Sequence, residues 1–163
     1  MIRNIPISES VSISPVILWL GERGQKDPSG KAITDSVQTS QRAKRVVIVE
    51  DEMFVALHLE TVLQDLGLEV CDIVATGSSA VQTVRNLSPD IVFMDINLRG
   101  DIDGVEAARI IRTSSEIPIV FITAYGDQAT LSRINDIAPD APVIQKPPMT
   151  SALLAAIKKV IRT

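Results

Sequence analysis

The sequence predicts an α/β protein built on a doubly wound, five-stranded parallel sheet with helices on both faces. Three observations lead to this fold class. Short runs of Val and Ile are bounded by turn residues, which is typical of buried parallel strands. From residue 45 onward these runs alternate with segments of helical length, which favours right-handed strand–helix–strand crossovers. Apolar residues make up 45% of the 163 residues and aromatic residues only 3%, so the core must be aliphatic.

The expected strands share an apolar run and lie near residues 45–50, 69–74, 90–95, 117–123 and 142–145. The expected helices follow these strands and lie near residues 52–66, 78–87, 104–113, 127–136 and 150–161. Apolar residues recur at helical spacing in the first helix and predict its apolar face: Phe54, Leu57, Val62 and Leu66. Gly67 is expected to end this helix.

The later helices carry their own start and stop signals. Ser88-Pro89 is expected to end the second helix, because a residue before proline avoids the helical conformation. Asp103 is expected to cap the third helix, with Glu106 completing a capping box. Thr150 is expected to cap the last helix.

Composition and charge exclude several classes of protein. Residues 1–43 carry five basic and four acidic side chains, whereas residues 44–163 carry eleven and sixteen. This acidic balance argues against a direct nucleic-acid partner. No apolar run reaches the roughly 18–20 residues of a membrane span, and none forms a signal-peptide core. Cys71 is the only cysteine, which fits a reducing compartment, so we expect a cytoplasmic protein.

Residues 1–43 are expected to form an N-terminal extension outside the folded domain, which spans residues 44–163. The extension is rich in Ser, Thr, Gln, Gly and Pro. Its segment GERGQKDPSGK is typical of a loop or linker. Two interpretations stay open. The extension is a flexible leader, or it forms a short helix near residues 15–20 whose Trp19 docks on the domain.

Reactive polar residues lie at the ends of four of the expected strands. Glu50 and Asp51 follow the first, Asp95 ends the third, Thr123 ends the fourth, and Lys146 follows the fifth. In an open parallel sheet, ligands bind at the carboxyl ends of the strands. Three carboxylates, a hydroxyl and an ammonium are therefore expected at one edge, where they would form a metal and phosphate site.

These residues in this order resemble the response-regulator receiver domain of bacterial two-component signalling. The resemblance covers about residues 44–162 and rests on Glu50-Asp51, Asp95, Thr123 and Lys146 followed by proline. An acidic pair after a strand is common by itself, whereas the complete set at strand ends is specific. The resemblance implies the flavodoxin-like strand order 2-1-3-4-5.

The resemblance implies that Asp95 is the phosphoacceptor, because a carboxylate can attack phosphorus and form an acyl phosphate. It also implies a site for Mg²⁺, or Mn²⁺, which prefers hard oxygen ligands. Asp51 and Asp95 would bind the ion directly, Glu50 mainly through water, and Asn97 through its backbone carbonyl. Many receivers have Asp at the position of Glu50, so the substitution affects the fine geometry of the metal site.

Other residues match the family's phosphoryl-binding and switch positions. Lys146 would pair with a phosphoryl oxygen, and Pro147 would follow a cis peptide bond that aims this lysine at the site. Thr123 would act as the switch hydroxyl, and the small Ala124 would leave the phosphate pocket open. The aromatic residue that the family usually has three positions before the lysine is absent, because the residue there is Val143.

Tyr125 is the nearest candidate for a relocated aromatic switch. The resemblance implies a phosphorylation switch rather than a turnover enzyme, with a sensor histidine kinase as phosphoryl donor. Because no output domain follows residue 163, we expect output by contact with a downstream protein or phosphotransferase. Relatives also dimerise through the fourth helix, fifth strand and fifth helix, which makes this surface a candidate for a homodimer.

Alternative functions stay open at this point. A phosphate-independent interaction module would keep only the fold, and Val143 gives this hypothesis some weight. A metal-dependent phosphatase would need a general acid two residues after the nucleophile, where the chain has Asn97. A calcium loop starting at Asp95 is excluded, because Arg99 stands at a ligand position and the segment follows a strand instead of a helix.

Overall fold

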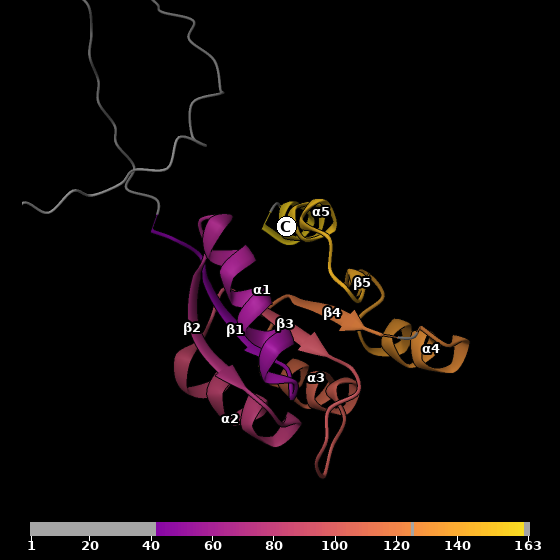
Figure 1. Cartoon of the computed structure of the whole chain (residues 1–163). Helices are drawn as coiled ribbons and strands as arrows, with labels where there is room; N and C mark the ends of the chain where they lie inside the picture. The colour runs from indigo at the N-terminus through magenta and orange to yellow at the C-terminus, as the bar shows by residue number, and fades with distance from the viewer. Residues whose placement is uncertain (1–41, 125, 162–163) are drawn as a thin grey trace, which may run out of the picture. The chain divides into compact units, whose positions relative to one another are not determined.

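The computed structural model describes residues 42–124 and 126–161, which form a parallel sheet between two layers of helices (Figure 1). The strands are β1 (Arg45–Val49), β2 (Glu69–Val74), β3 (Ile91–Asp95), β4 (Ile119–Thr123) and β5 (Val143–Gln145). Their order is β2-β1-β3-β4-β5, and all pairs are parallel. The predicted fold class and strand order are confirmed. The proposed helix near residues 15–20 and Tyr125 lie outside the described residues.

The helices alternate with the strands as the sequence predicts. They are α1 (Met53–Asp65), α2 (Gly77–Leu87), α3 (Gly104–Arg112), α4 (Gln128–Ile137) and α5 (Thr150–Ile161). Their ends lie within one residue of the predicted ranges. Within the two described ranges, no helix combines the length and the apolar character that crossing a bilayer requires.

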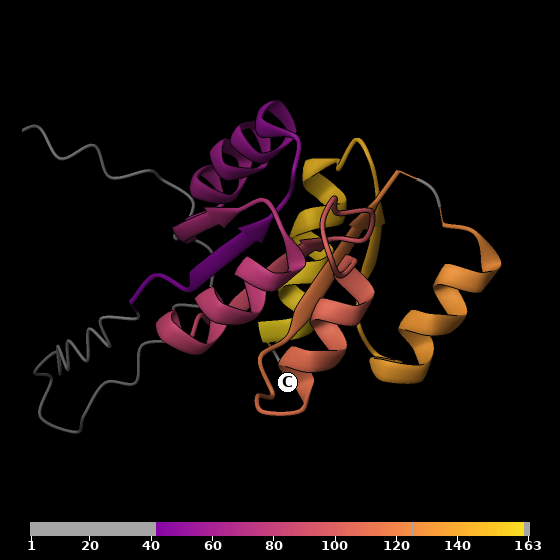
Figure 2. The ribbon, with the colours of Figure 1, turned by 90° about the horizontal axis from the view of Figure 1, so that it is seen from below.

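The sheet has a separate apolar core on each face, because successive side chains of a strand point to opposite sides. In β1, Val46 and Ile48 pack with α1 and α5, whereas Val47 and Val49 pack with α2, α3 and α4. Figure 2 shows these two layers of helices. Both faces are therefore covered, which explains why the strands are nearly continuous apolar runs.

Helix ends follow the local signals in the sequence. Gly67 has φ +83° and donates its N–H to the carbonyl oxygen of Gln64 at 2.9 Å. The next N–H, from Leu68, donates to the carbonyl oxygen of Leu63 at 3.1 Å. These two bonds form a Schellman motif, so Gly67 ends α1 as predicted. Ser88 ends α2 with φ 45°.

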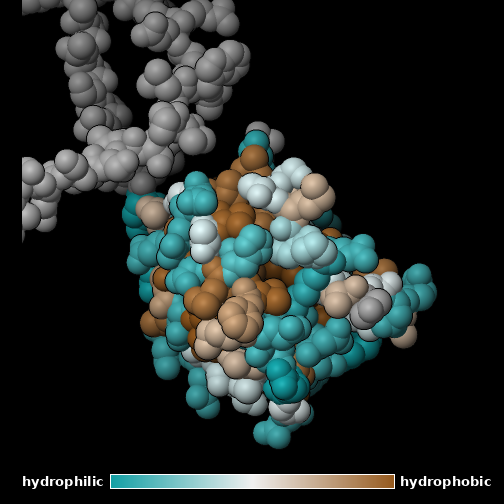
Figure 3. Space-filling view, viewed as in Figure 1, coloured by the Kyte–Doolittle hydropathy of each residue, from teal (hydrophilic) through white to brown (hydrophobic). Residues whose placement is uncertain are grey.

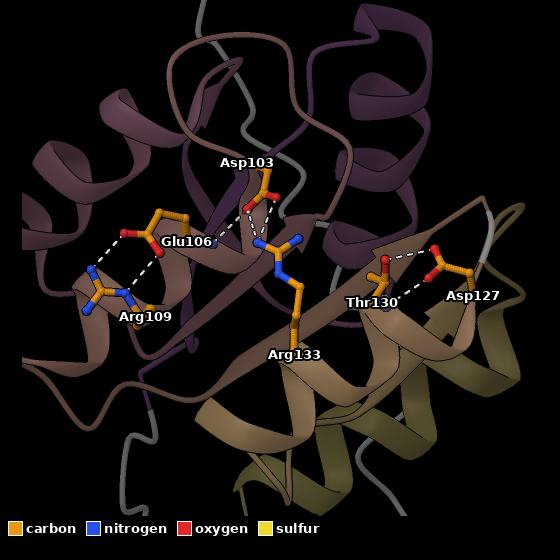
Figure 4. A network of polar contacts seen from close by, with 6 residues as sticks. All are labelled: Asp103, Glu106, Arg109, Asp127, Thr130 and Arg133. Atoms are coloured by element: carbon orange, nitrogen blue, oxygen red, sulfur yellow. Dashed lines mark hydrogen bonds and ion pairs between the residues drawn. The ribbon is translucent and has the colours of Figure 1, made fainter.

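The helix N-termini confirm one predicted cap and correct two details, of which Figure 4 shows those at the start of α3. The Asp103 carboxylate accepts the N–H of Glu106 at 2.8 Å and caps α3. The Glu106 carboxylate does not complete a capping box, because it accepts two hydrogen bonds from Arg109 at 2.7 and 2.9 Å. The helix α5 begins at Thr150 itself, and the preceding carbonyl of Met149 accepts its first backbone bonds.

The expected apolar face of α1 is partly wrong. The residues buried against the sheet are Ala56, Leu59 and Leu63, whereas Phe54 is 89% exposed and Leu57 is 45% exposed. Residues two apart on a helix lie about 200° apart around its axis, so a face centred on Ala56 leaves Phe54 in solvent. Figure 3 shows hydrophobic residues gathered on the surface over α1.

The parallel arrangement gives the sheet two different edges. The loops that follow β1, β3, β4 and β5 all lie at the carboxyl edge, where the expected polar residues are. The described chain enters the sheet at the opposite, amino edge through Arg45. The final helix starts after β5 at the carboxyl edge and runs back toward the amino edge (Figures 1 and 2).

Candidate functional site

Three acidic side chains gather at the carboxyl edge of β1 and β3. Carboxylate oxygens of Glu50, Asp51 and Asp95 all lie within 4.8 Å of one another. Glu50 is 3% exposed and Asp95 is 4% exposed, while Asp51 is partly exposed. A partly accessible set of hard oxygen donors fits the requirements of Mg²⁺, which keeps several waters when it binds to protein carboxylates.

Lys146 joins this cluster from the end of β5, the edge strand beside β4. Its Nζ lies 2.7 Å from Oε2 of Glu50 and 2.8 Å from Oδ2 of Asp95. The backbone N–H of Lys146 donates to the carbonyl oxygen of Thr123 at 2.7 Å, which continues the pairing of β4 and β5. The peptide bond between Lys146 and Pro147 is cis.

The buried carboxylates and the ammonium alter one another's ionisation. Burial raises the pKa of Glu50, and the negative charge of Asp95 raises it further, although the bond from Lys146 opposes the shift. Burial alone would lower the pKa of Lys146. Its hydrogen bonds to the two carboxylates outweigh this effect, so the pKa of Lys146 is raised and the ammonium stays charged.

A second cation, Arg99, contacts the cluster from the loop between β3 and α3. Its Nε donates a hydrogen bond to Oδ2 of Asp51 and forms an ion pair with it. The guanidinium therefore holds the pKa of the Asp51 carboxyl below its usual value. The sequence does not predict this contact, because Arg99 lies in a loop without a periodic pattern and is informative there only in excluding a calcium loop.

Backbone groups fix the direction of the two buried carboxylates. The N–H of Asn97 donates to Oδ1 of Asp95 at 3.2 Å, and the N–H of Glu52 donates to Oε1 of Glu50 at 3.3 Å. Each carboxylate thus accepts one bond from the loop after its own strand and one from Lys146.

The first residue of α3 packs directly against the strand end that carries Asp95. A Cβ atom added to Gly104 would lie 1.9 Å from the carbonyl oxygen of Asp95. The N–H of Gly104 also donates to the carbonyl oxygen of Ile96 at 2.9 Å. Only a residue without a side chain fits here, so Gly104 sets the path of the loop around the acidic cluster.

The other predicted site residues lie along the neighbouring strand ends. Thr123 is buried at the end of β4, and Ala124 after it is exposed. Val143, which stands where an aromatic residue was expected, is 38% exposed on β5. The structure therefore brings Glu50, Asp51, Asp95 and Lys146 into direct proximity, and it places Thr123 on the strand beside Lys146.

Comparisons with known proteins agree with this geometry. A family model described as the response regulator receiver domain matches residues 46–158. The transcriptional regulatory protein PdtaR of Mycobacterium tuberculosis is 31% identical over 118 residues, which cover 72% of this chain and 57% of that protein. The DNA-binding response regulator MtrA of Mycolicibacterium smegmatis is 36% identical over 84 residues, covering 52% of this chain and 36% of that protein.

A solved structure with the same fold is the signal receiver domain of a modulated diguanylate cyclase from Desulfovibrio desulfuricans. It aligns with a TM-score of 0.69 and 34% identity, covering 74% of this chain and 94% of that domain. This chain spans 57% or less of the length of the two regulators above. Their likeness therefore concerns the part of each protein that has the receiver fold.

Proposed function

We propose that this chain, which belongs to the family of response regulator receiver domains, is a phosphorylation-dependent signalling switch with Asp95 as its phosphoacceptor. The observation that carries the proposal is the environment of the Asp95 carboxylate. It is almost fully buried, lies beside Glu50 and Asp51, and has the ammonium of Lys146 at 2.8 Å. Buried acids grouped with one bound lysine match a site that receives a phosphoryl group.

In the proposed reaction, a carboxylate oxygen of Asp95 attacks the phosphorus of a phosphohistidine on a sensor histidine kinase. The new bond is an acyl phosphate, and the bond between phosphorus and the donor nitrogen breaks. Asp51 and Asp95 would hold Mg²⁺ directly, Glu50 through water, and Asn97 through its backbone carbonyl. When bound, the ion supplies positive charge against the incoming phosphoryl oxygens.

Lys146 and Thr123 serve the phosphorylated state in this proposal. The Lys146 ammonium pairs with a phosphoryl oxygen in place of one of its present carboxylate partners, because a flexible point charge can follow the group. The Thr123 hydroxyl donates to another phosphoryl oxygen, and the small Ala124 leaves room for the group. Pro147 follows the cis bond that directs Lys146 toward Asp95.

The signalling step is proposed as a population shift between two arrangements of the loop after Thr123, of α4 and of β5. The usual aromatic partner of this movement is replaced by the exposed Val143. Tyr125 is the proposed substitute. Output is proposed to occur by contact with a downstream protein or phosphotransferase, and α4, β5 and α5 form the proposed surface of a homodimer.

The proposed organisation is a receiver domain over residues 44–163 with an N-terminal extension over residues 1–43. The domain carries more acidic than basic side chains, so we propose no direct contact with nucleic acid or membrane. The proposed location is the cytoplasm. The domain would catalyse its own phosphorylation and, more slowly, hydrolysis of the acyl phosphate.

Incubation with acetyl phosphate and Mg²⁺, followed by intact-protein mass measurement, tests the proposal. The wild-type chain should gain one labile phosphoryl group, and the Asp95→Asn variant should gain none. Asp101→Asn is the matched control, because Asp101 is an exposed acid of the loop that follows Asp95, and its loss should leave phosphoryl uptake unchanged. EDTA should abolish uptake by the wild-type chain.

The same experiment separates the alternatives. A phosphate-independent module, which the exposed Val143 favours, would gain no phosphoryl group in any of the three proteins. A metal-dependent phosphatase would release phosphate continuously from added phosphate esters. Either result would refute the proposed switch.

A further inference from the structure

The ion pair between Arg99 and Asp51 uses one of the carboxylates proposed to hold the metal ion. The two side chains differ in accessibility, since that of Arg99 is 81% exposed and that of Asp51 is 11% exposed. The guanidinium reaches in from solvent to a carboxylate that lies at the rim of the buried cluster. It can therefore move away into water without any change in the core.

Two cations divide the three acidic groups in this structure. Lys146 lies between Glu50 and Asp95, and Arg99 contacts Asp51. Each carboxylate thus has a positive partner that belongs to the chain itself. A divalent ion held by Asp51 would lie close to the guanidinium, because Arg99 contacts Oδ2 of the same carboxylate, and like charges at this range repel each other.

We propose that Arg99 competes with the divalent ion for Asp51, so that it sets how much metal the site requires before Asp95 can be phosphorylated. This inference rests on the proposed function and adds a regulatory residue to the same site. Arg99 acts through Asp51 and is a positioning residue, since it touches neither of the proposed reacting atoms. The competition weakens metal binding without blocking it, because exposed ion pairs are weak.

The size of the effect follows from that weakness. An ion pair with a solvent-exposed partner shifts a competing equilibrium by roughly 1.4- to 5-fold. Loss of Arg99 also removes a positive charge that repels the ion. We therefore expect the Arg99→Gln variant to bind Mg²⁺ and Mn²⁺ about 3- to 10-fold more tightly than the wild-type chain.

The test measures metal affinity directly, by calorimetric titration of the full chain with Mg²⁺ and by the electron paramagnetic resonance signal of free Mn²⁺. Arg109→Gln is the matched control, because Arg109 also pairs with a carboxylate, that of Glu106 on α3. It removes the same charge and should leave the dissociation constant within about 1.5-fold. Arg99→Lys, which keeps the charge but loses the planar guanidinium, should fall between wild type and Arg99→Gln.

The outcomes separate the inference from the proposed function. Equal affinities in wild type and Arg99→Gln, or weaker binding in the variant, would overturn the inference while phosphorylation of the wild-type chain by acetyl phosphate still supported the switch. An equal gain in Arg109→Gln would also overturn it, because net charge alone would then explain the change. Absence of metal binding in every protein would overturn both.

Discussion

Replacing Lys146 by Met would remove the positive charge that lies between two buried carboxylates. The ammonium contacts Glu50 at 2.7 Å and Asp95 at 2.8 Å, and its side chain is only 13% exposed. Methionine has a similar length and can fill the same space. The substitution therefore tests the charge with little change in packing.

The magnitude follows from the charges that are left behind. Oxygen atoms of Glu50 and Asp95 lie within 4.8 Å, and two unit charges at that separation repel by about 3.5 kcal/mol at an effective dielectric constant of 20. Breaking a buried ion pair typically costs about 3–5 kcal/mol. Partial access of water and proton uptake by Glu50 relieve part of this cost. We expect the free energy of unfolding to fall by roughly 2–4 kcal/mol at pH 7.

The pH dependence has a definite sign. Without the ammonium, which opposes the effect of burial, the pKa of Glu50 rises further above its unfolded value, so the folded variant binds a proton more readily than the unfolded chain. Its stability then increases as the pH falls through the raised pKa toward the ordinary pKa of a glutamate, and the deficit relative to wild type shrinks. Mg²⁺ should also recover part of the deficit, because it restores positive charge at the cluster.

Urea unfolding followed by circular dichroism, at several pH values with either EDTA or Mg²⁺, measures these quantities. Lys158→Met is the control, because Lys158 is an exposed lysine on α5 and its loss should change stability by less than about 0.5 kcal/mol. A deficit below about 1 kcal/mol for Lys146→Met would refute the electrostatic argument. A deficit that is constant with pH would refute it equally.

Two further substitutions test other contacts around the sheet. Gly104→Ala places a Cβ atom 1.9 Å from a backbone carbonyl oxygen. Thermal unfolding should therefore show that the free energy of unfolding falls by at least about 2 kcal/mol. Gly126→Ala is the control, because its Cβ would meet only ordinary contacts from 3.6 Å, and its free energy of unfolding should stay close to that of wild type. The Asp90 carboxylate accepts the N–H of Arg45 at 2.8 Å, and this bond lowers the pKa of Asp90. The ionised Asp90 therefore stabilises the fold above about pH 4, and the stabilisation is lost as the pH falls further. The stability difference between wild type and Asp90→Asn should therefore shrink in acid, and a difference that grows would contradict this assignment.

The order and type of the elements could be predicted because two signals agree along the chain. Apolar runs such as that of β3 are fully buried, and the turn residues between these runs mark where the helices begin and end. Gly67 and Asp103 act at helix ends as their chemistry predicts. The face of α1 was less predictable, because Phe54 and Leu57 are apolar yet lie in solvent. Periodicity alone does not show that a helix has more apolar residues than its core requires.

The close approach of Asp51, Asp95 and Lys146 could also be expected, since parallel strands deliver their carboxyl ends to one edge. The contact of Arg99 with Asp51 could not. Arg99 lies in a loop whose path has no periodic signal, and its long side chain can point in several directions. Only the folded path around Gly104 shows where that guanidinium reaches.

The placement of the two ends of the described chain has a practical consequence for immobilised or labelled protein. Arg45 starts β1 at the amino edge of the sheet, and α5 runs back to the same edge before it ends at Ile161. A strand of five residues spans about 16 Å, so Arg45 and Ile161 both lie roughly that far from the acidic cluster at the other end of the strands. A sensor-chip linker or a fluorescent protein attached directly at either of these two points would leave the approach of a kinase or a metal ion open.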